Sequence, residues 1–528
     1  MMRILVLDGV KEAGVRALYN RGWQVDIIPR SWTEEELIFG IGEYDALIVR
    51  SATKITAPVI EAAKSLKVIG RAGVGVDNID LEAATRKGIV VVNAPDGNTI
   101  AAAEHSLALM LALARNIPRG DVSLKEGRWD RRQLVGVELR QKTLGILGLG
   151  RIGSAVARRA QAFEMVCIGY DPYVSLDQAK RIGVELVSYQ ELLERSDFLT
   201  IHMPLTNDTR HLLDAKAINL MKPGARIINV ARGGIVCETA LAEALRSGHI
   251  AGAALDVFEE EPVVSSPLLD CPNVVLTPHL GASTEEAQLH VAMDVSEAIA
   301  CLLGGGLPNN AVNMVGLTPE IMEKLIPYID LAEKLGAFLA QMGGGIDRLR
   351  ITYTGSLVGL ETGAITTATL KGMLARIVDD HVNLVNADYL ARRRGIKVET
   401  VHKGNGDDYH NRIAIEAETS DGVLTVAGSV FQPDVPRIVE INGYRVDAVP
   451  TGYMLVAPHQ DKPGIIGQVG TILGQAEINI GTMQVGRKTP GGPAVMVLGT
   501  DNELPNDVLT AICQIQGIQG ARQVVLSD

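Results

Sequence analysis

The chain has few cysteines, no excess of positive charge and no long apolar segment. Its five cysteines are odd in number, scattered and free of a C-x-x-C pattern, which favours reduced thiols in a cytoplasmic protein. The formal net charge of -12 argues against nucleic acid or an anionic membrane as the main partner. The most apolar helical run, 106–114, is too short to span a bilayer, and the N-terminus lacks the apolar region of a signal peptide. We therefore expect a globular protein of the cytoplasm.

At 528 residues the chain is too long for one core, and its 47% hydrophobic content is ample to bury several. Short apolar strands alternate with helical patterns in two successive stretches, 1–95 and 96–282, as in parallel α/β domains. A glycine and proline cluster at 304–308 ends this part of the chain. Mixed α/β patterns without an assignable motif follow over 317–450, and 451–528 has the β-α-β-β-α-β order of a ferredoxin-like unit. We therefore expect three or four α/β domains.

The segment from Lys142 to Asp171 reads as strand, glycine turn, helix, strand and carboxylate. Its turn fits G-x-G-x-x-G, in which the first glycine permits the tight turn, the second lets a pyrophosphate approach and the third lets helix and strand pack. The three glycines are Gly148, Gly150 and Gly153. The carboxylate of Asp171 would accept hydrogen bonds from a ribose and repel a 2′-phosphate. The pattern predicts a dinucleotide site that prefers NAD to NADP.

Three polar residues later in the chain suit the oxidation of a 2-hydroxy acid, namely Arg232, Glu261 and His279. An arginine fork binds a carboxylate and polarises the forming carbonyl. A histidine takes the hydroxyl proton near neutral pH, and an adjacent carboxylate raises its proton affinity. In an open α/β sheet ligands bind beyond the carboxyl ends of the strands, which is where Asp256 and His279 fall. Together with the glycine turn, these residues predict a dehydrogenase.

Several motifs, in order, resemble the D-isomer-specific 2-hydroxyacid dehydrogenases: RAGVGVDNID, GLGRIG, NVARGGIV, AGAALDVFEEEP and TPHLGAST. NAPDGNT, the KGMLARIVDDHVNLVNA region and a C-terminal DKPGIIG extend the resemblance to the long-form phosphoglycerate dehydrogenases of that family, over nearly the whole chain. It implies an α/β fold with a Rossmann-like NAD domain inserted in a flavodoxin-like substrate domain, then an α/β intervening domain and a ferredoxin-like ACT domain. The implied boundaries are 1–95 with 283–316, 96–282, 317–450 and 451–528.

In such enzymes the reaction is the NAD-dependent oxidation of 3-phosphoglycerate to 3-phosphooxypyruvate, which leads to L-serine. The resemblance makes His279 the acid and base, Glu261 its partner, and Arg232 the residue on the substrate carboxylate. The positions implied to meet NAD are Val74, Gly148, Gly150, Arg151, Ile152, Gly153, Asp171, Met203, Val230, Ala231, Arg232, Asp256, His279, Leu280, Gly281 and Ala282. Val74 and Met203 can be threonine in relatives, but the backbone can make both contacts. The positions implied to meet the substrate are Arg50, Ser51, Arg71, Gly73, Asn98 and Arg131, the last able to act across a subunit boundary.

The ACT-like unit implies regulation, since such modules bind amino acids, often between two copies. L-serine is the expected effector, on His459, Asp461 and Asn479. Relatives have asparagine in place of Asp461, whose carboxylate could hold the serine ammonium or repel the serine carboxylate. A module kept only for assembly therefore stays an alternative.

The resemblance also implies a homotetramer, and no metal ion is expected in the site. Two other functions stay open. One is the dehydrogenation of a different 2-hydroxy acid such as 2-hydroxyglutarate. The other is an NAD-sensing corepressor that recruits peptide partners, against which the intact trio of Arg232, Glu261 and His279 argues.

Overall fold

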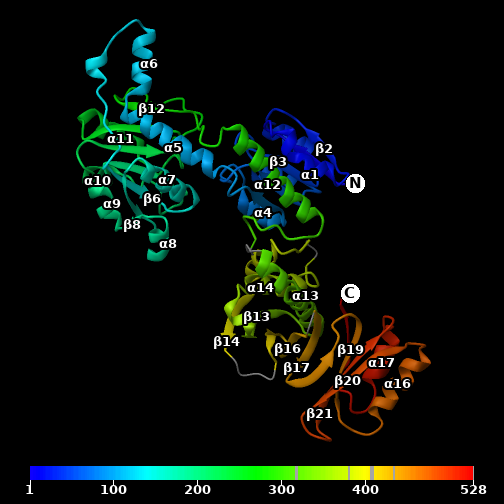
Figure 1. The fold of residues 1–528 in the computed structure, drawn as a ribbon. Helices are drawn as coiled ribbons and strands as arrows, with labels where there is room; N and C mark the ends of the chain where they lie inside the picture. The colour runs from blue at the N-terminus through cyan, green and yellow to red at the C-terminus, as the bar shows by residue number, and fades with distance from the viewer. Residues whose placement is uncertain (315–318, 379–380, 405–408, 432–433, 527–528) are drawn as a thin grey trace.

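The chain forms successive α/β lobes, each with its own β-sheet, in the part that the structure describes (Figure 1). This computed structural model describes all residues except 315–318, 379–380, 405–408, 432–433 and 527–528. We name the lobes first to fourth in the chain order of their sheets. The α/β class expected from the sequence is confirmed.

The first lobe has a five-stranded parallel sheet with the flavodoxin-like order β2-β1-β3-β4-β5. Its strands are β1 (Arg3–Val6), β2 (Gln24–Ile27), β3 (Ala46–Val49), β4 (Val68–Arg71) and β5 (Val90–Asn93). Its helices are α1 (Arg16–Tyr19), α2 (Glu34–Gly40), α3 (Ala57–Ala62) and α4 (Leu81–Lys87). Strand β3 is an unbroken apolar run buried along its whole length, as a parallel sheet covered on both faces requires.

A helix from much later in the chain completes this lobe. Helix α12 (Glu285–Leu303) packs its apolar side against β4, β5 and α1. The packing is close, because a Cβ added to Gly70 of β4 would lie 2.3 Å from Val295 Cγ1. The first lobe is therefore discontinuous in sequence, and the second lobe lies between its two parts.

The second lobe has a seven-stranded parallel sheet with order β12-β11-β10-β9-β6-β7-β8. The chain order reverses between β6 and β9, which is the switch point where Rossmann-like sheets bind ligands. Its strands are β6 (Thr143–Leu147), β7 (Val166–Tyr170), β8 (Glu185–Leu186), β9 (Phe198–Ile201), β10 (Ala225–Asn229), β11 (Ile250–Leu255) and β12 (Val274–Leu276). Its helices are α5 (Thr99–Ala114), α6 (Ile117–Lys125), α7 (Arg151–Ala162), α8 (Leu176–Arg181), α9 (Tyr189–Arg195), α10 (Ala215–Leu220) and α11 (Glu238–Ser247).

Helix α5 connects the first two lobes to a projecting arm. It follows the crossing from β5, packs on α7 and β11, and ends at Ala114. Figure 1 shows α6 and the loop after it extending beyond the sheet, on the side away from the first lobe. The arm exposes large apolar side chains, including Trp129 at 80% and Leu124 at 60%.

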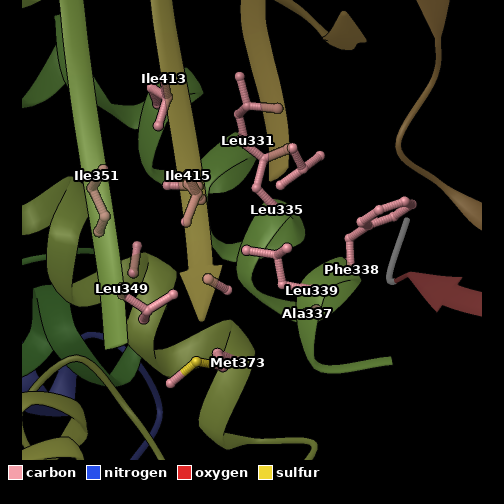
Figure 2. Packing of buried hydrophobic residues seen from close by; sticks show 14 of the residues in the cluster. Leu331, Leu335, Ala337, Phe338, Leu339, Leu349, Ile351, Met373, Ile413 and Ile415 are labelled. Atoms are coloured by element: carbon pink, nitrogen blue, oxygen red, sulfur yellow. The ribbon is translucent and has the colours of Figure 1, made fainter. Parts of the chain in front are cut away.

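The third lobe has a six-stranded sheet of order β14-β13-β15-β16-β17-β18, antiparallel except for β13 with β14. Its elements are α13 (Pro319–Met342), β13 (Ile346–Gly355), α14 (Gly363–Leu374), α15 (Ala387–Arg393), β14 (Lys397–Lys403), β15 (Asn411–Thr419), β16 (Gly422–Phe431), β17 (Val435–Ile441) and β18 (Tyr444–Ala448). In Figure 2, side chains of α13 and α14 face those of β13 and β15 to form its core.

The fourth lobe has the expected β-α-β-β-α-β order and an antiparallel sheet of order β20-β21-β19-β22. Its elements are β19 (Gly452–Gln460), α16 (Ile465–Gln475), β20 (Ile480–Arg487), β21 (Pro493–Thr500), α17 (Asn506–Cys513) and β22 (Arg522–Leu526). One face of the sheet packs on α16 and α17. The other contributes to the core of the third lobe, with Val456, Val497 and Val524 among its members. The two C-terminal lobes therefore share one apolar core.

Among the residues that the structure describes, no helix combines the length and apolar character needed to cross a bilayer.

Candidate active site

The glycine turn at the carboxyl end of β6 has the geometry that its sequence predicts. Gly148 has a φ of +95°, and a Cβ there would lie 2.6 Å from the carbonyl oxygen of His202. A Cβ on Gly153 would lie 2.0 Å from the carbonyl oxygen of Gly148, so only glycine lets α7 begin so close to β6. A Cβ on Gly150 would meet nothing within 4 Å. The backbone at Gly150 therefore faces open space at the first turn of α7, where a pyrophosphate fits.

Asp171 lies where the sequence predicts, directly after β7. Its Oδ2 accepts a hydrogen bond from Leu149 N at 2.8 Å and its Oδ1 accepts one from Tyr173 N at 2.9 Å. These bonds fix the carboxylate beside the glycine turn while leaving acceptor capacity for ribose hydroxyls. Arg151, expected at the phosphates, forms an ion pair with Asp96.

Most other residues expected at the cofactor follow neighbouring strands of the second sheet at its carboxyl edge. Met203 follows β9, Val230 and Ala231 follow β10, and Ala282 lies in the loop after β12. Ile152 belongs to the first turn of α7, and Val74 lies in the first lobe after β4. Gly281 packs against Val230, because a Cβ on Gly281 would lie 3.0 Å from Val230 Cγ1. These residues and the open turn at Gly150 fit a dinucleotide.

Asp256, directly after β11, is completely buried at the centre of a hydrogen-bond cluster. Its Oδ1 accepts from Leu280 N at 2.7 Å and from Thr277 Oγ1 at 2.5 Å, and its Oδ2 accepts from Gly281 N at 2.8 Å. Nε2 of His105, in α5, lies 3.1 Å from Oδ1. Burial alone would raise the pKa of Asp256, but the hydrogen bonds from His105, Thr277 and Leu280 outweigh it and lower the pKa. Asp256 is therefore held as a buried carboxylate.

His279 and Glu261 form the pair that the sequence predicts. The His279 Nδ1 lies 2.7 Å from Glu261 Oε2, and Phe258 N donates to the other carboxylate oxygen at 3.0 Å. Burial would raise the pKa of Glu261, but the hydrogen bonds from His279 and Phe258 outweigh it and keep the pKa below its usual value. The carboxylate therefore fixes one ring nitrogen of His279, and Nε2 is left to exchange a proton with a substrate.

Arg232 lies where the second lobe meets the first, but its guanidinium is already engaged. Nε donates to Asp77 Oδ2 of the first lobe at 3.1 Å, and Nη1 donates to the Ala231 carbonyl oxygen at 2.7 Å. Nη2 lies against Gly75, where an added Cβ would be 1.9 Å away. The two-pronged carboxylate contact expected of Arg232 thus requires Asp77 to give way or the ligand to use Nη1 and Nη2.

Arg71 and Arg50 extend this positive charge into the first lobe. Burial, and after it the positive charges of Arg232 and Arg50, lower the pKa of Arg71 to about 10, against smaller opposite effects of Asp77 and Asp8. The Arg71 Nε is buried without a hydrogen-bond partner among the described residues. An under-compensated arginine among other arginines is the setting of an anion site.

The remaining residues expected at the substrate differ in their surroundings: some lie against Arg71 or are buried, and others are exposed. The Arg71 guanidinium lies over Gly73, where a Cβ would be 1.5 Å from Nη1. Asn98 occupies the N-cap position of α5 but makes no side-chain capping bond, and its Oδ1 is buried without a partner in the described part of the chain. Ser51 is exposed directly after Arg50. Arg131 is exposed in the short 3-10 helix Arg131–Gln133 on the arm.

The residues expected to bind the effector do not form one cluster in a single chain. His459 is buried at the end of β19, and Asp461 beyond it accepts from Arg487 Nη1 at 2.7 Å. Asn479 precedes β20 and donates to Asp501 Oδ2 at 2.8 Å. The register places His459 opposite Ala494 and Ile480 opposite Thr500, so the groups lie at opposite ends of the sheet, roughly 20 Å apart.

Sequence reasoning missed Asp77, His105 and Thr277. Asp77 lies 155 positions from Arg232, and His105 lies 151 positions from Asp256. No local sequence pattern predicts contacts between residues so far apart. The one signal was a pair of polar residues, Glu104 and His105, inside the otherwise apolar sequence of α5.

Comparison with known proteins identifies the family of the chain. Residues 107–281 match the D-isomer specific 2-hydroxyacid dehydrogenase NAD binding domain, 324–442 match the D-3-phosphoglycerate dehydrogenase intervening domain, and 454–517 match the ACT domain. A D-3-phosphoglycerate dehydrogenase of Methanocaldococcus jannaschii is 48% identical over 98% of this chain and 99% of its own length. That of Bacillus subtilis is 44% identical over the whole of both chains. The chain belongs to the D-3-phosphoglycerate dehydrogenase family.

Solved structures agree over the catalytic part. The TT0316 protein of Thermus thermophilus is 37% identical, with a TM-score of 0.55, over 59% of this chain and 100% of its own. A D-lactate dehydrogenase of Aquifex aeolicus complexed with NAD and lactic acid is 29% identical, with a TM-score of 0.53, over 60% and 100%. The chain is an NAD-dependent D-2-hydroxyacid dehydrogenase, as the sequence predicts.

Proposed function

We propose that the protein oxidises 3-phosphoglycerate at its C2 hydroxyl to 3-phosphooxypyruvate and so begins the synthesis of L-serine. The observation that carries this proposal is the pairing of His279 with Glu261 beside a cleft that also holds Arg232 and the under-compensated Arg71. A substrate with a carboxylate at one end and a phosphate at the other needs two separate groups of cations. Relatives that match over the full length carry the name of this activity.

In this proposal the substrate lies between the first two lobes. Arg232 binds the carboxylate through its Nη atoms, while Arg71 and Arg50 bind the phosphate. The Ser51 hydroxyl and the Asn98 side-chain NH₂ group donate further hydrogen bonds to the substrate, which passes over the backbone at Gly73. A phosphate would supply the partner that Arg71 Nε lacks and restore the ordinary balance of charge around it.

His279 handles the proton. Its Nδ1 is held by Glu261 at 2.7 Å, so Nε2 is the nitrogen that takes the proton of the C2 hydroxyl. The ring becomes positive as the proton arrives, and the Glu261 carboxylate stabilises that charge. NAD, when bound, supplies the acceptor for the hydride. The carboxyl edge from Gly148 to Asp171, with Val230 and the loop at Leu280, would hold it.

Two features support an assembly of several copies. The arm around α6 exposes a group of apolar side chains that a monomer leaves in water, and such patches mark protein interfaces. Arg131 lies on this arm beside the exposed Trp129, so we propose that it reaches the cleft of a neighbouring copy in a homotetramer.

L-serine inhibition belongs to the same proposal. Because His459 and Asn479 lie at opposite ends of one sheet, both can contact one ligand only if two fourth lobes meet end to end. Asp461 already has Arg487 as its partner, so its carboxylate is neutralised and repels a serine carboxylate less than a free aspartate would.

The test is an assay of the full-length protein with 3-phosphoglycerate and NAD at alkaline pH, with hydrazine to trap the keto product. We expect NADH formation that falls as L-serine is added. Turnover with 2-hydroxyglutarate far above that with 3-phosphoglycerate would reject the substrate. Full turnover that L-serine does not change would reject only the regulation.

A further inference from the structure

His105 joins the connecting helix α5 to the loop that carries His279. Its Nε2 lies 3.1 Å from Asp256 Oδ1 and 3.2 Å from Thr277 Oγ1. The side chain is largely buried, with 19% exposed. Because Asp256 is an acceptor at Oδ1, Nε2 of His105 must carry a proton and donate it to that carboxylate. An element from outside the sheet thus supplies one of the bonds that hold Asp256.

Asp256 in turn shapes the backbone on both sides of His279. Its carboxylate accepts from the amides of Leu280 and Gly281, and its own carbonyl oxygen accepts from His279 N at 2.9 Å. Thr277 adds its hydroxyl on the other side of His279. The loop is not relaxed, because His279 has a φ of +54°, a conformation that non-glycine residues adopt only when their surroundings impose it.

The start of the same helix reaches the proposed substrate site. Asn98 occupies the N-cap position of α5, and His105 lies about two turns further along. A rigid helix with Asn98 at one point and His105 at another ties the position of the loop to the crossing between the lobes. Nothing in the packing of the sheet requires a histidine here, since the neighbouring buried positions Ala102, Ala103 and Ser106 are small.

We propose that His105 is a positioning residue for the reaction: it holds Asp256 so that the Thr277–Gly281 loop presents the His279 ring to the substrate. This inference rests on the proposed function for its kinetic consequence only. His105 does not touch the reacting atoms and acts through Asp256.

The experiment compares His105→Met with His105→Gln in the full-length protein. Methionine fills similar space without a donor, whereas the glutamine amide nitrogen reaches about as far as Nε2 and can donate. We expect His105→Met to lower kcat by about 10- to 100-fold with KM for 3-phosphoglycerate nearly unchanged, the scale of a misplaced catalytic group. His105→Gln should recover most of that loss. Thr277→Val should act in the same direction, with a double variant little worse than His105→Met.

A second measurement does not depend on turnover. Hydrogen exchange at the amides of Leu280 and Gly281 should become several-fold faster in His105→Met and return toward the wild-type rate in His105→Gln, because these amides lose a well-held acceptor. Amides of β6 should not change. The matched control is His249→Met, since the His249 ring bonds to the Ile218 carbonyl oxygen in the same lobe, at 3.0 Å.

The outcomes separate the two ideas. If His105→Met keeps wild-type kcat and wild-type exchange in this loop, the positioning role is overturned. It is also overturned if the methionine and glutamine variants lose activity equally and in proportion to a lowered Tm. If the wild type does not oxidise 3-phosphoglycerate but the exchange results are as expected, the proposed substrate fails while His105 still positions the His279 loop.

Discussion

The junction between the first two lobes is formed by charged residues, whereas the joint between the last two lobes is formed by apolar residues. At the junction, the contacts that cross between lobes are charged, such as Arg232 with Asp77, and Arg71 has a buried nitrogen without a partner among the described residues. In the C-terminal joint, one apolar cluster runs from α13 into the sheet of the fourth lobe. Figure 2 shows Phe338 of α13 directed toward β22.

The charged junction is suited to binding a ligand, whereas the apolar joint stabilises the fold. A buried donor without a partner, such as Arg71 Nε, gains a hydrogen bond when an anionic ligand supplies the acceptor. Separating the third and fourth lobes would expose their shared apolar core to water, which costs free energy, so we expect these two lobes to move as one body.

The most severe change on the cleft side is His279→Ala, which removes the proton acceptor. We expect kcat to fall by about 10²- to 10⁴-fold, the usual scale for general acid-base catalysis, with the NAD affinity nearly unchanged. Glu261→Gln, which keeps the shape but not the charge of the partner, should lose less. Steady-state kinetics with both substrates measure this, and a His279→Ala enzyme within threefold of wild type would exclude the role.

On the other side of the comparison, Phe338→Ala should break the C-terminal joint. The side chain is 1% exposed in the shared core, and truncation of such a phenylalanine costs about 3–5 kcal/mol of unfolding free energy. Thermal unfolding should show a lowered transition for both C-terminal lobes together. Phe39→Ala, at a position 96% exposed, is the matched control and should change stability little. Separate transitions for the two lobes in the wild type would contradict the shared core.

Arg71→Met tests whether Arg71 contributes to substrate binding and not to the stability of the free protein. Loss of a charge-assisted contact to phosphate should raise KM for 3-phosphoglycerate by about 10- to 100-fold. The free protein should not lose stability, because Arg71 is buried near other arginines and its Nε has no partner in the described structure. Arg181→Met, at an exposed position of α8, is the control. A variant that binds substrate normally but unfolds more easily would show that Arg71 is structural.

The smallest expected effect concerns a polar contact within the apolar joint. The Gln341 side chain of α13 bonds both backbone groups of Val525, with Nε2 to the carbonyl oxygen at 3.0 Å and the amide to Oε1 at 2.9 Å. Gln341→Ala should cost about 1 kcal/mol in stability and leave kcat without serine unchanged. The informative reading is the response to L-serine, which should weaken if this contact transmits the signal. An identical serine titration would assign coupling to the apolar core alone.

The fold was readable from the sequence where the signal was local. Buried parallel strands such as β3 and β10 are short apolar runs, and the glycine turn carries its own geometry. Strand β2 was missed because its sequence QVDI is not apolar throughout. Its Asp26 instead accepts hydrogen bonds from Arg3 and from Tyr44 at 3.2 and 2.9 Å.

The placement of the proposed catalytic trio was also readable, because each of its residues follows a strand that ends at the same edge of the sheet. What could not be read was which partners these residues would find in space. Asp77 on Arg232 and His105 on Asp256 come from elements more than 150 positions away, and only the packed lobes bring them together. The separation of His459 from Asn479 follows from how β19, β20 and β21 pair, which is a property of the folded sheet.

The end-to-end separation of His459 and Asn479 has a consequence for the cell. The proposed serine site needs residues from both ends of the sheet, so an isolated chain could not form it, and by the law of mass action inhibition would depend on the concentration of the enzyme itself. At concentrations below the dissociation constant of the paired fourth lobes, the protein would keep its catalytic residues but would no longer be inhibited by L-serine. Inhibition by L-serine would then occur only when the concentration of the enzyme exceeds that dissociation constant.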